Sequence, residues 1–478
     1  MLTVLLILIP LVTGLLTFGL KGSGPKVLGL ISSLASLAVV AGALFQFQTA
    51  PEGLQATASW IPQLGAQFSV GLDGMGLMLC LLTAVAFVLV FITIYNRNYE
   101  RPGSFYGLML LSQAGLIGVF TAYDALLFYV FWELALIPVY FLCSMWGGEK
   151  RIPVTFKFFI YTFTGSLLML VGIIYLYLQS PERSFSYAAF TSLHLPAEEQ
   201  SWLFWLLFVA FAIKMPIFPF HTWQPDTYEQ SPTPVTMILS GVMVKMGLFG
   251  VLRWLLPVLP EGAHMWSDTA IVLSVIGIVY ASCIAIVQQD LTRLNAYSSI
   301  AHIGLMCAAI FANNEQSLQG IQVQMFNHGI NIIGLWIIVE IIQQRLNIKN
   351  MNEMGGIAQY APRMAIFLVI IALANIALPL TNGFVGEFLM FSGLFQYNIW
   401  LMAIAGLGVI LAAVYTLNML QKVIFGQSNT LTATTTDLQN TELVALSLIV
   451  ILILFLGVYP KPMLELAGGT TELVNSLF

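Results

Sequence analysis

Six ionisable side chains stand inside long apolar runs of this sequence, and they are Glu133, Lys214, Lys245, His302, His328 and Glu387. Each can gain or lose a proton, and in chain order they alternate as acid, amine, amine, imidazole, imidazole and acid. An apolar environment favours the neutral form of an amine, whereas a nearby carboxylate favours its charged form. Movement of Glu133 relative to Lys214 would therefore switch that amine between holding and releasing a proton. The pattern predicts a path for protons.

A purely structural interpretation of these residues is also open. Glu133 and Lys214 could form a buried ion pair that only locks two helices together. Either histidine alone could be a hydrogen-bonded core residue, since imidazole suits both roles. A charge at the centre of a bilayer costs about 3 kcal/mol or more, so each group needs a partner or a wet cavity. A single structural ion pair does not explain six ionisable groups on six different segments, and this favours a path for protons.

The composition places these groups in a membrane. Of the 478 residues, 59% are hydrophobic and only 8% are charged, against about 25% charged in soluble domains. Continuous apolar runs of roughly 20 residues predict membrane-spanning helices, and they exclude the short alternating strands of a barrel. The net charge of −5 comes with no basic patch, so nucleic acid is not an expected partner. The expected partners are the lipid bilayer and other membrane subunits.

The apolar runs predict an all-α polytopic fold of about fourteen transmembrane helices. The predicted spans are 2–20, 27–47, 71–94, 105–122, 125–146, 153–179, 202–224, 234–258, 268–288, 295–313, 318–344, 365–394, 399–424 and 441–459. Glu340, near the inner end of its span, is expected to reach the interface beside Arg345.

The distribution of basic residues between the spans predicts the orientation. Loops after odd-numbered spans, counted together with the helix ends beside them, hold twelve, namely Lys21, Lys26, Arg97, Arg101, Lys150, Arg151, Lys157, Arg293, Arg345, Lys349, Arg363 and Lys422. The opposite side holds three, Arg183, Arg253 and Lys461. Because basic loops stay in the cytoplasm, we expect an inner (cytoplasmic) membrane protein with both termini on the outer, periplasmic side.

Two of the spans are interrupted. The seventh holds Pro216 and Pro219, and the twelfth holds Pro379 and Gly383 within "ALPLTNGFVGEF". Proline frees a backbone carbonyl, which is tolerated in lipid only where protein or trapped water satisfies it. Breaks five spans apart predict two inverted five-helix repeats. The expected domains are helices 1–3 (1–104), a first repeat (105–260), a second repeat (261–425) and a C-terminal loop with helix 14 (426–478).

No cofactor or metal site is expected within this chain. The cysteines Cys80, Cys143, Cys283 and Cys307 lie singly in apolar runs, without the clustered spacing of an iron–sulfur or zinc site. Neither GxGxxG nor GxxxxGK[ST] occurs, so a nucleotide site is not predicted.

Several stretches of the sequence resemble a known family. They are "FYVFWELALIPVYFLCSMWGG", "AIKMPIFPFHTWQPDTYEQSPTPVTMILSGVMVKMG", "LNAYSSIAHIGLM", "QMFNHGI" and "LTNGFVGEF". They are similar to the antiporter-like membrane subunits of proton-pumping NADH:quinone oxidoreductase, respiratory complex I, from about residue 70 to 425. An acid at Glu387, rather than a lysine, resembles the M branch of this family more than the L and N branches.

The resemblance implies roles for the six residues. The glutamate matching Glu133 pairs with the lysine matching Lys214, and the lysine matching Lys245 is central. Histidines matching His302 and His328 continue a hydrated axis, and the acid matching Glu387 serves the exit side. It also implies that NAD, FMN, iron–sulfur clusters and quinone are bound by partner subunits, and that this chain is a translocase subunit without a redox centre beside sibling antiporter-like chains.

The sequence departs from the family pattern at a few positions. "DLTRLNAYSS" places Thr292 and Asn295 where the family usually has a basic and an apolar residue, and "LPLT" places Leu380 where the family usually reads "LPGT". Leu380 removes a flexible residue from the second break, so the shape of that half-helix is expected to differ.

Other functions in the same superfamily are compatible with these motifs. They include a subunit of a multisubunit sodium/proton antiporter, of a membrane-bound hydrogenase or of the photosynthetic relative of complex I. A stand-alone solute transporter is less favoured, because the sequence offers only proton-compatible groups at mid-membrane rather than recognition groups for a solute. A structural spacer would need no buried amines.

Overall fold

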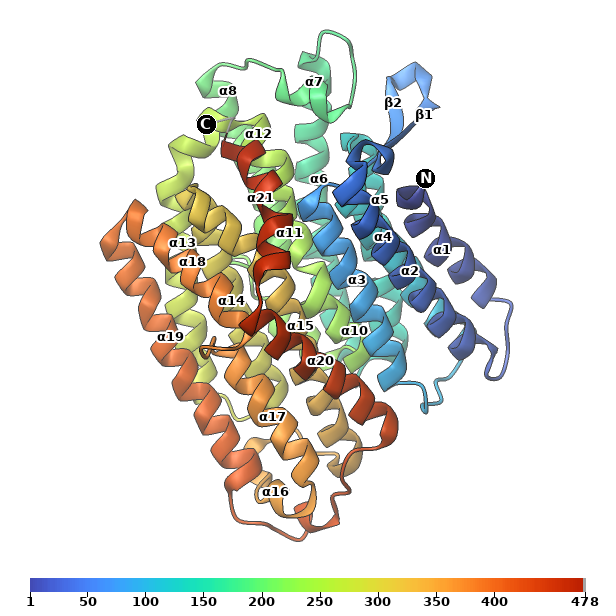
Figure 1. The fold of residues 1–478 in the computed structure, drawn as a ribbon, viewed down its shortest axis with the longest axis vertical. Coiled ribbons are helices and arrows are strands. Elements are labelled where there is room, and N and C mark those ends of the chain that lie inside the picture. Colours follow the sequence, from blue (N-terminus) through green and yellow to red (C-terminus); the bar gives the residue numbers. More distant parts are fainter. Residues whose placement is uncertain (476–478) are drawn as a thin grey trace. The chain divides into compact units, whose positions relative to one another are not determined.

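The computed structural model describes residues 1–475, with side chains as far as residue 468, and the chain is predominantly helical (Figure 1). By packing, the described chain divides into two compact units. The first comprises Met1–Met215, Val242–Ser267 and residues 466–475, and the second comprises Pro216–Gly241 and Asp268–Glu465. The predicted domain boundaries follow sequence order rather than packing, and they remain a prediction.

The first unit is built mainly from the N-terminal helices. Its helices are α1 (Leu2–Thr17), α2 (Gly24–Thr49), α3 (Gly74–Thr93), α4 (Pro102–Thr121), α5 (Ala125–Trp146), α6 (Arg151–Gln179), α7 (Tyr187–Thr191), α8 (Ala197–Lys214), α11 (Lys245–Gly250) and α12 (Leu256–Val258), with the π-helical segment η4 (Val251–Leu255) and the 3-10 turns η1 (Pro51–Leu54) and η2 (Pro62–Leu64). Helix α4 packs against α1, α3 and α5, and α8 packs against α6 and α11.

The first unit also contains a short antiparallel hairpin of β1 (Ala56–Ile61) and β2 (Ala66–Val70), so the all-α prediction is wrong in this detail. The strands pair from Ala56 opposite Val70, with one irregularity in the register after Ser59. Gly65 has a φ of 65°, a left-handed conformation that glycine adopts without steric cost and that reverses the chain here. The spans were predicted from long apolar runs, and the hairpin lies between two such runs, so it was not predicted.

The second unit is built around α15. Its helices are α9 (Gln224–Gln230), α10 (Thr233–Ile238), α14 (Leu291–Ala312), α15 (Glu315–Leu346), α16 (Ile357–Tyr360), α17 (Pro362–Asn375), α18 (Asn382–Tyr397), α19 (Ile399–Leu420) and α20 (Asn440–Val458), with the π-helical segment η6 (Gln421–Phe425) and the 3-10 turns η5 (Met351–Glu353) and η7 (Thr432–Thr434). Helix α15 packs against α14, α17, α18 and α20. The elements that cross the division along the chain are η3 (Leu239–Met243, π-helical), α13 (Pro260–Val287) and α21 (Lys461–Asn475).

Within residues 1–475, eleven helical segments are long and apolar enough to cross a membrane. They are α2 to α6, the segment Thr233–Val258, α13 to α15, Ile399–Phe425 and α20. The other predicted spans correspond to the short α1, to α8 and to the interrupted pair α17 and α18. A polytopic, predominantly helical fold is therefore confirmed, while the count of fourteen and the inverted repeats remain predictions.

Both predicted breaks are present. Helix α8 ends at Lys214 and α9 begins at Gln224, with both prolines of the seventh predicted span between them and a cis peptide before Pro219. Helix α17 ends at Asn375 and α18 begins at Asn382. Each break leaves carbonyl groups at a helix end without a partner in their own helix.

Two asparagines of α15 satisfy carbonyls on both sides of the second break. The Nδ2 group of Asn331 donates to the carbonyl of Ala374 at 3.2 Å. The Nδ2 group of Asn327 donates to the carbonyl of Asn382 at 2.7 Å. The two asparagines are four residues apart, so they lie on one face of α15, and they hold the two half-helices against that face.

Leu380 lies in the left-handed region at this break, with a φ of 73° and a side chain that is 70% exposed. The turn therefore keeps a conformation that favours glycine, although the sequence supplies leucine. A side chain in this region costs roughly 1 to 2 kcal/mol, and glycine would lose about 0.5 to 1 kcal/mol through its larger freedom in the unfolded chain.

We expect Leu380→Gly to raise the free energy of unfolding by about 0.5 to 1 kcal/mol, because the left-handed strain that it removes is larger than the entropic cost of glycine. Thermal unfolding of the detergent-solubilised protein measures the change. Leu378→Gly, in the same turn but without a positive φ, is the matched control and should give no gain. Equal or lower stability of the Leu380 variant relative to this control contradicts the strain argument.

Candidate functional site

Lys214 is the last residue of α8, and its side chain is only 2% exposed. The carbonyls at the end of a helix carry partial negative charge and favour a cation there. The Nζ atom also lies 5.5 Å from the centre of the Trp132 ring, an arrangement that attracts a cation electrostatically. The broken helix thus supplies part of the environment that a buried amine requires.

Glu133 lies on α5, next in sequence to that tryptophan, and is half-buried. Its charge interacts with that of Lys214. The hydroxyl of Tyr129, one helical turn earlier, is hydrogen-bonded to Glu133 and to Ser166 of α6. Glu133 is near enough to act on the charge of Lys214, but Lys214 Nζ and Glu133 Oε1 each lie buried without a hydrogen-bond partner among the described residues, so the pairing of the two remains a prediction.

Lys245 begins α11 and is fully buried. One residue separates Lys245 from the end of the π-helical segment η3 (Leu239–Met243). Such π-helical turns within α-helices occur frequently at functional sites. A Cβ atom at Gly247 would lie 2.6 Å from the carbonyl oxygen of Phe211. Only glycine permits this close approach, which holds the helix of Lys245 against the helix of Lys214.

The second unit brings His302, His328 and Glu387 together. The Nδ1 atom of His302, on α14, lies 3.0 Å from Oε1 of Glu387, on α18. The rings of His302 and His328 have their centres 5.6 Å apart. The Nε2 atom of His328, on α15, lies 3.4 Å from the hydroxyl of Ser299. All three residues are buried, with exposed fractions of 8%, 2% and 6% in chain order.

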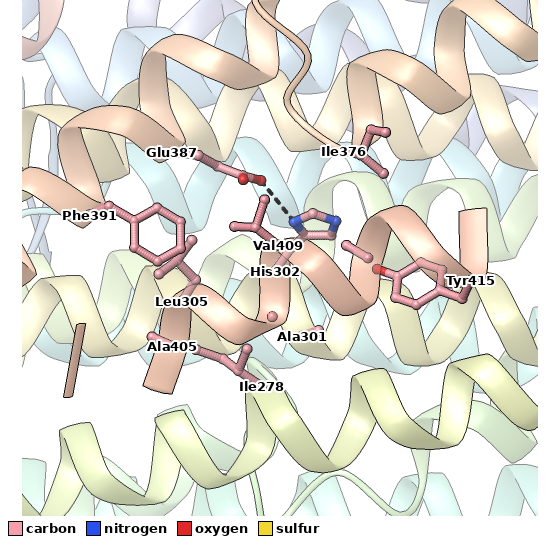
Figure 2. Close-up of a pocket in the computed structure, with 12 residues that line it drawn as sticks. Ile278, Ala301, His302, Leu305, Ile376, Glu387, Phe391, Ala405, Val409 and Tyr415 are labelled. Atoms are coloured by element: carbon pink, nitrogen blue, oxygen red, sulfur yellow. Dashed lines mark hydrogen bonds and ion pairs between the residues drawn. The ribbon is translucent and has the colours of Figure 1, made fainter. Parts of the chain in front are cut away.

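A cavity of about 20 Å³ in the second unit is lined by both His302 and Glu387 (Figure 2). His302, Glu387 and Tyr415 contribute its polar lining, and apolar residues of α13, α14, α18 and α19 complete it. A cavity needs about 10 to 15 Å³ to hold a water molecule, together with two to four polar partners. The site is therefore large and polar enough for one water molecule.

The six predicted residues form two groups. Glu133, Lys214 and Lys245 belong to the first unit, and His302, His328 and Glu387 belong to the second. Their roles in proton transfer remain predictions. Within the described residues, no group of three His, Cys, Asp or Glu side chains gathers as ligands for a metal ion.

Residues 122–413 match the model of a family described as NADH:quinone oxidoreductase/Mrp antiporter, transmembrane. The NADH-quinone oxidoreductase subunit M of Rickettsia typhi is 37% identical over 415 residues, which cover 87% of this chain and 84% of that protein. The chain belongs to this family. The F(420)H(2) dehydrogenase subunit M of Methanosarcina mazei is 32% identical, over 99% of this chain and 98% of that protein.

The fold agrees with a solved chain of respiratory complex I. A chain of respiratory complex I from Thermus thermophilus, solved with bound NADH, superposes with a TM-score of 0.91. The two chains are 29% identical, and the match covers 99% of this chain and 100% of that one. The resemblance to the complex I family, and within it to subunit M, is thereby confirmed.

Sequence reasoning missed the polar side chains around the acid of the second group. The Nε2 group of Gln324 donates to Oε1 of Glu387 at 3.3 Å. Gln324, Asn327 and Asn331 recur at spacings of three and four residues on α15, so they occupy one polar stripe of a buried helix. That periodicity within an otherwise apolar run was the signal that could have identified them.

Arg253 lies within the predicted span 234–258, and its side chain is buried rather than facing the loop with which it was counted. Arg253 lies in the π-helical segment η4, is 4% exposed and forms an ion pair with Asp73, the N-cap residue of α3. Its Nη1 group also donates to the hydroxyl of Tyr123 at 3.2 Å, and burial raises the pKa of Tyr123 to about 12. The arginine lies two helical turns from Lys245, so this pair anchors the helix that carries the central amine.

The expectation for Glu340 is also corrected. Glu340 is 4% exposed, and it accepts a hydrogen bond from Gln344 at 3.1 Å, one turn later on α15. Arg345 donates instead to Glu442 of α20, with 2.5 Å between Nη2 and Oε2. The turn of α15 on which Glu340 lies is covered by other helices, so its carboxylate does not reach an interface.

We expect Asp73→Asn to lower the free energy of unfolding by about 3 kcal/mol, because it leaves the buried guanidinium of Arg253 without a counter-ion. Asparagine keeps the oxygen that caps α3, so the loss of stability measures the effect of removing the carboxylate charge. Asp268→Asn is the control, because Asp268 is exposed and bonded only by Tyr397 among the contacts described, and it should change stability by less than about 0.5 kcal/mol. Thermal unfolding compares them, and equal losses would exclude an anchoring role.

Proposed function

We propose that this chain is a proton-translocating membrane subunit of an NADH:quinone oxidoreductase, moving protons through buried Glu, Lys and His side chains. The observation that carries the proposal is the placement of Lys214, buried at the end of a broken helix and interacting electrostatically with Glu133. Membership of the antiporter-like family supports it. Redox chemistry in partner subunits would drive the movement.

The amine and the acid of the first unit would act as a switch. While Glu133 is ionised and close, it stabilises the charged form of Lys214. When Glu133 is neutralised or moves away, the apolar surroundings favour the neutral amine, so the proton leaves. Lys245, held against the same helix through Gly247, is the next group in the proposed path.

The acid and the imidazole of the second unit would pass protons toward the exit. The 3.0 Å contact between His302 and Glu387 is within the reach that proton transfer between positioned groups requires. His328 adds a second imidazole next to the first. Six titratable groups along one chain are more than a structural spacer would need.

We propose that NAD, FMN, iron–sulfur clusters and quinone are bound by partner subunits rather than by this chain. The single cysteines and the missing nucleotide motifs of the sequence support this. Sibling antiporter-like chains of the membrane arm are the proposed neighbours. The similar chain from Thermus thermophilus is part of a respiratory complex I, which supports assembly into a complex of that kind.

We further propose fourteen membrane spans in two inverted repeats, in the cytoplasmic membrane, with both termini on the periplasmic side. The paired helix breaks support the repeats. Because Arg253 is buried in its helix, only Arg183 and Lys461 remain on the side with few basic residues, against twelve on the other. The stronger asymmetry supports the orientation.

A second candidate function differs in the electron donor. The relative from Methanosarcina mazei is named a subunit of an F(420)H(2) dehydrogenase and matches nearly the whole chain. The family description also includes Mrp antiporters. The buried groups of this chain handle protons alone, so the same path would serve an assembly driven by a different donor or by a sodium gradient.

Purification of the chain from its native membrane through a C-terminal tag tests the assembly and the orientation. We expect NADH-binding and iron–sulfur subunits to co-purify, and the assembly to oxidise NADH. In spheroplasts the tag should be accessible to an added protease. Companions that oxidise F420H2, or only antiporter chains, favour the second candidate, and a protected tag contradicts the orientation.

Substitution of Lys214 tests whether this residue transfers protons or only holds two helices together through its pair with Glu133. We expect Lys214→Arg to lower proton pumping on the order of 100-fold, the contribution of one positioned acid–base group, because arginine keeps the charge but does not release its proton. Pumping per NADH is measured in proteoliposomes. Lys422→Arg, at an exposed position, should pump normally. If the Lys214 variant pumps as well as this control, the pair only locks helices.

A further inference from the structure

The hydrogen bonds of His302 account for only one of its two ring nitrogens. Nδ1 contacts Glu387, whereas Nε2 is buried without a hydrogen-bond partner among the described residues. A buried polar atom that lacks a partner costs about 1 to 3 kcal/mol. The ring lines the cavity of about 20 Å³, so a water molecule held there would lie beside the imidazole.

The opposite side of this cavity carries the Tyr415 side chain of α19. Figure 2 shows Glu387 and Tyr415 on opposite sides of the imidazole, with the hydroxyl end of the tyrosine toward the ring. Tyr415 is 1% exposed, and its hydroxyl interacts electrostatically with Glu387. A water molecule in the cavity would therefore find polar groups on both sides.

The tyrosine is held by a hydrogen-bonded chain that leads to the second helix break. Its hydroxyl lies 3.0 Å from the hydroxyl of Ser298 on α14. The Nδ2 group of Asn375 donates to that serine at 3.1 Å. Asn375 is the last residue of α17, and its neighbour Ile376 lines the cavity. The position of the half-helix thus bears directly on the orientation of the Tyr415 hydroxyl.

We propose that Tyr415, oriented by Ser298 and Asn375, positions a water molecule on Nε2 of His302 and couples this site to the broken helix. This inference rests on the proposed function for its role in pumping, but the water site itself does not. Tyr415 is a positioning residue, because it acts through the water. A shift of α17 would remove the hydrogen bond of Asn375, reorient the hydroxyls and release the water.

The proton step through this site balances without any change of oxidation state. A protonated water in the cavity gives its excess proton to Nε2 of His302 as the Nδ1–H bond breaks and that proton passes to the carboxylate of Glu387. The water is left neutral, the imidazole is neutral with its proton on Nε2, and Glu387 is left as the neutral acid on the exit side. Without the water, Nε2 has no donor and the step does not begin.

The first test is the density of the native complex in a cryo-EM map that resolves ordered water. We expect one water molecule within hydrogen-bond distance of Nε2 of His302 and of the Tyr415 hydroxyl, and we expect it to be lost in Tyr415→Phe. This readout does not depend on the electron donor or on pumping. If the wild-type cavity is dry, or if the water persists in the variant, the proposal is wrong.

The second test is proton pumping by the complete complex. We expect Tyr415→Phe to lower the pumping rate roughly five-fold, the rate effect of losing one neutral hydrogen bond, with unchanged thermal stability. Tyr106→Phe, which alters another buried tyrosine far along the sequence in the first unit, is the matched control. Ser298→Ala should resemble Tyr415→Phe, while Ser298→Thr, which keeps the hydroxyl, should pump normally.

The outcomes separate this inference from the proposed function. Equal pumping by Tyr415→Phe and Tyr106→Phe, or failure of Ser298→Thr to pump better than Ser298→Ala, overturns the positioning role. If instead the purified assembly does not use NADH, the proposed function fails, but the water density and its loss in Tyr415→Phe still decide the inference.

Discussion

The free energy of burying an ionisable group away from water is the constraint on which the rest of this structure depends. A charge in the hydrocarbon region costs about 3 kcal/mol or more unless a partner or water compensates it. Lys214 meets this constraint through the end of its own helix, the face of Trp132 and the charge of Glu133. The apolar surroundings favour the neutral amine, and a group proposed to release protons must be able to take that form.

The broken helices follow from the same constraint. Interrupting a helix inside a membrane frees carbonyl groups, and those groups then require donors. At the second break, Asn331 of α15 donates to the carbonyl of Ala374 near the end of α17, Asn327 donates to the carbonyl of Asn382 at the start of α18, and the side chain of Asn375 donates to Ser298. The polar stripe of α15 therefore serves two purposes, because the same helix carries His328 and contacts Glu387 through Gln324. Polar side chains of α15 thus both bond to backbone carbonyls beside the break and contact a residue of the proposed proton path.

Fixed ion pairs and transferable protons are kept apart in this chain. Arg253 and Asp73 form a pair whose cation does not titrate at any ordinary pH, and it anchors the helix of Lys245. Arg345 and Glu442 join α15 to α20 in the same way. The groups proposed to transfer protons are lysine, histidine and glutamate, whose charge responds to their surroundings. Arginine thus occurs in the ion pairs that hold helices together, whereas lysine occurs in the proposed proton path.

The sequence by itself determined the membrane fold class, the two helix breaks and the six ionisable residues within apolar segments. Composition, proline and apolar run length are local properties, and in a bilayer they act almost without tertiary help because every backbone group must bond internally. The β-hairpin, the burial of Arg253 and the surroundings of Glu340 depended on which helices pack beside them. Only the tertiary structure decided that Glu387 meets His302 rather than another base, and that Tyr415 shares its cavity. His302 and Glu387 are 85 positions apart in the chain, and no local pattern specifies which faces of separate helices come into contact.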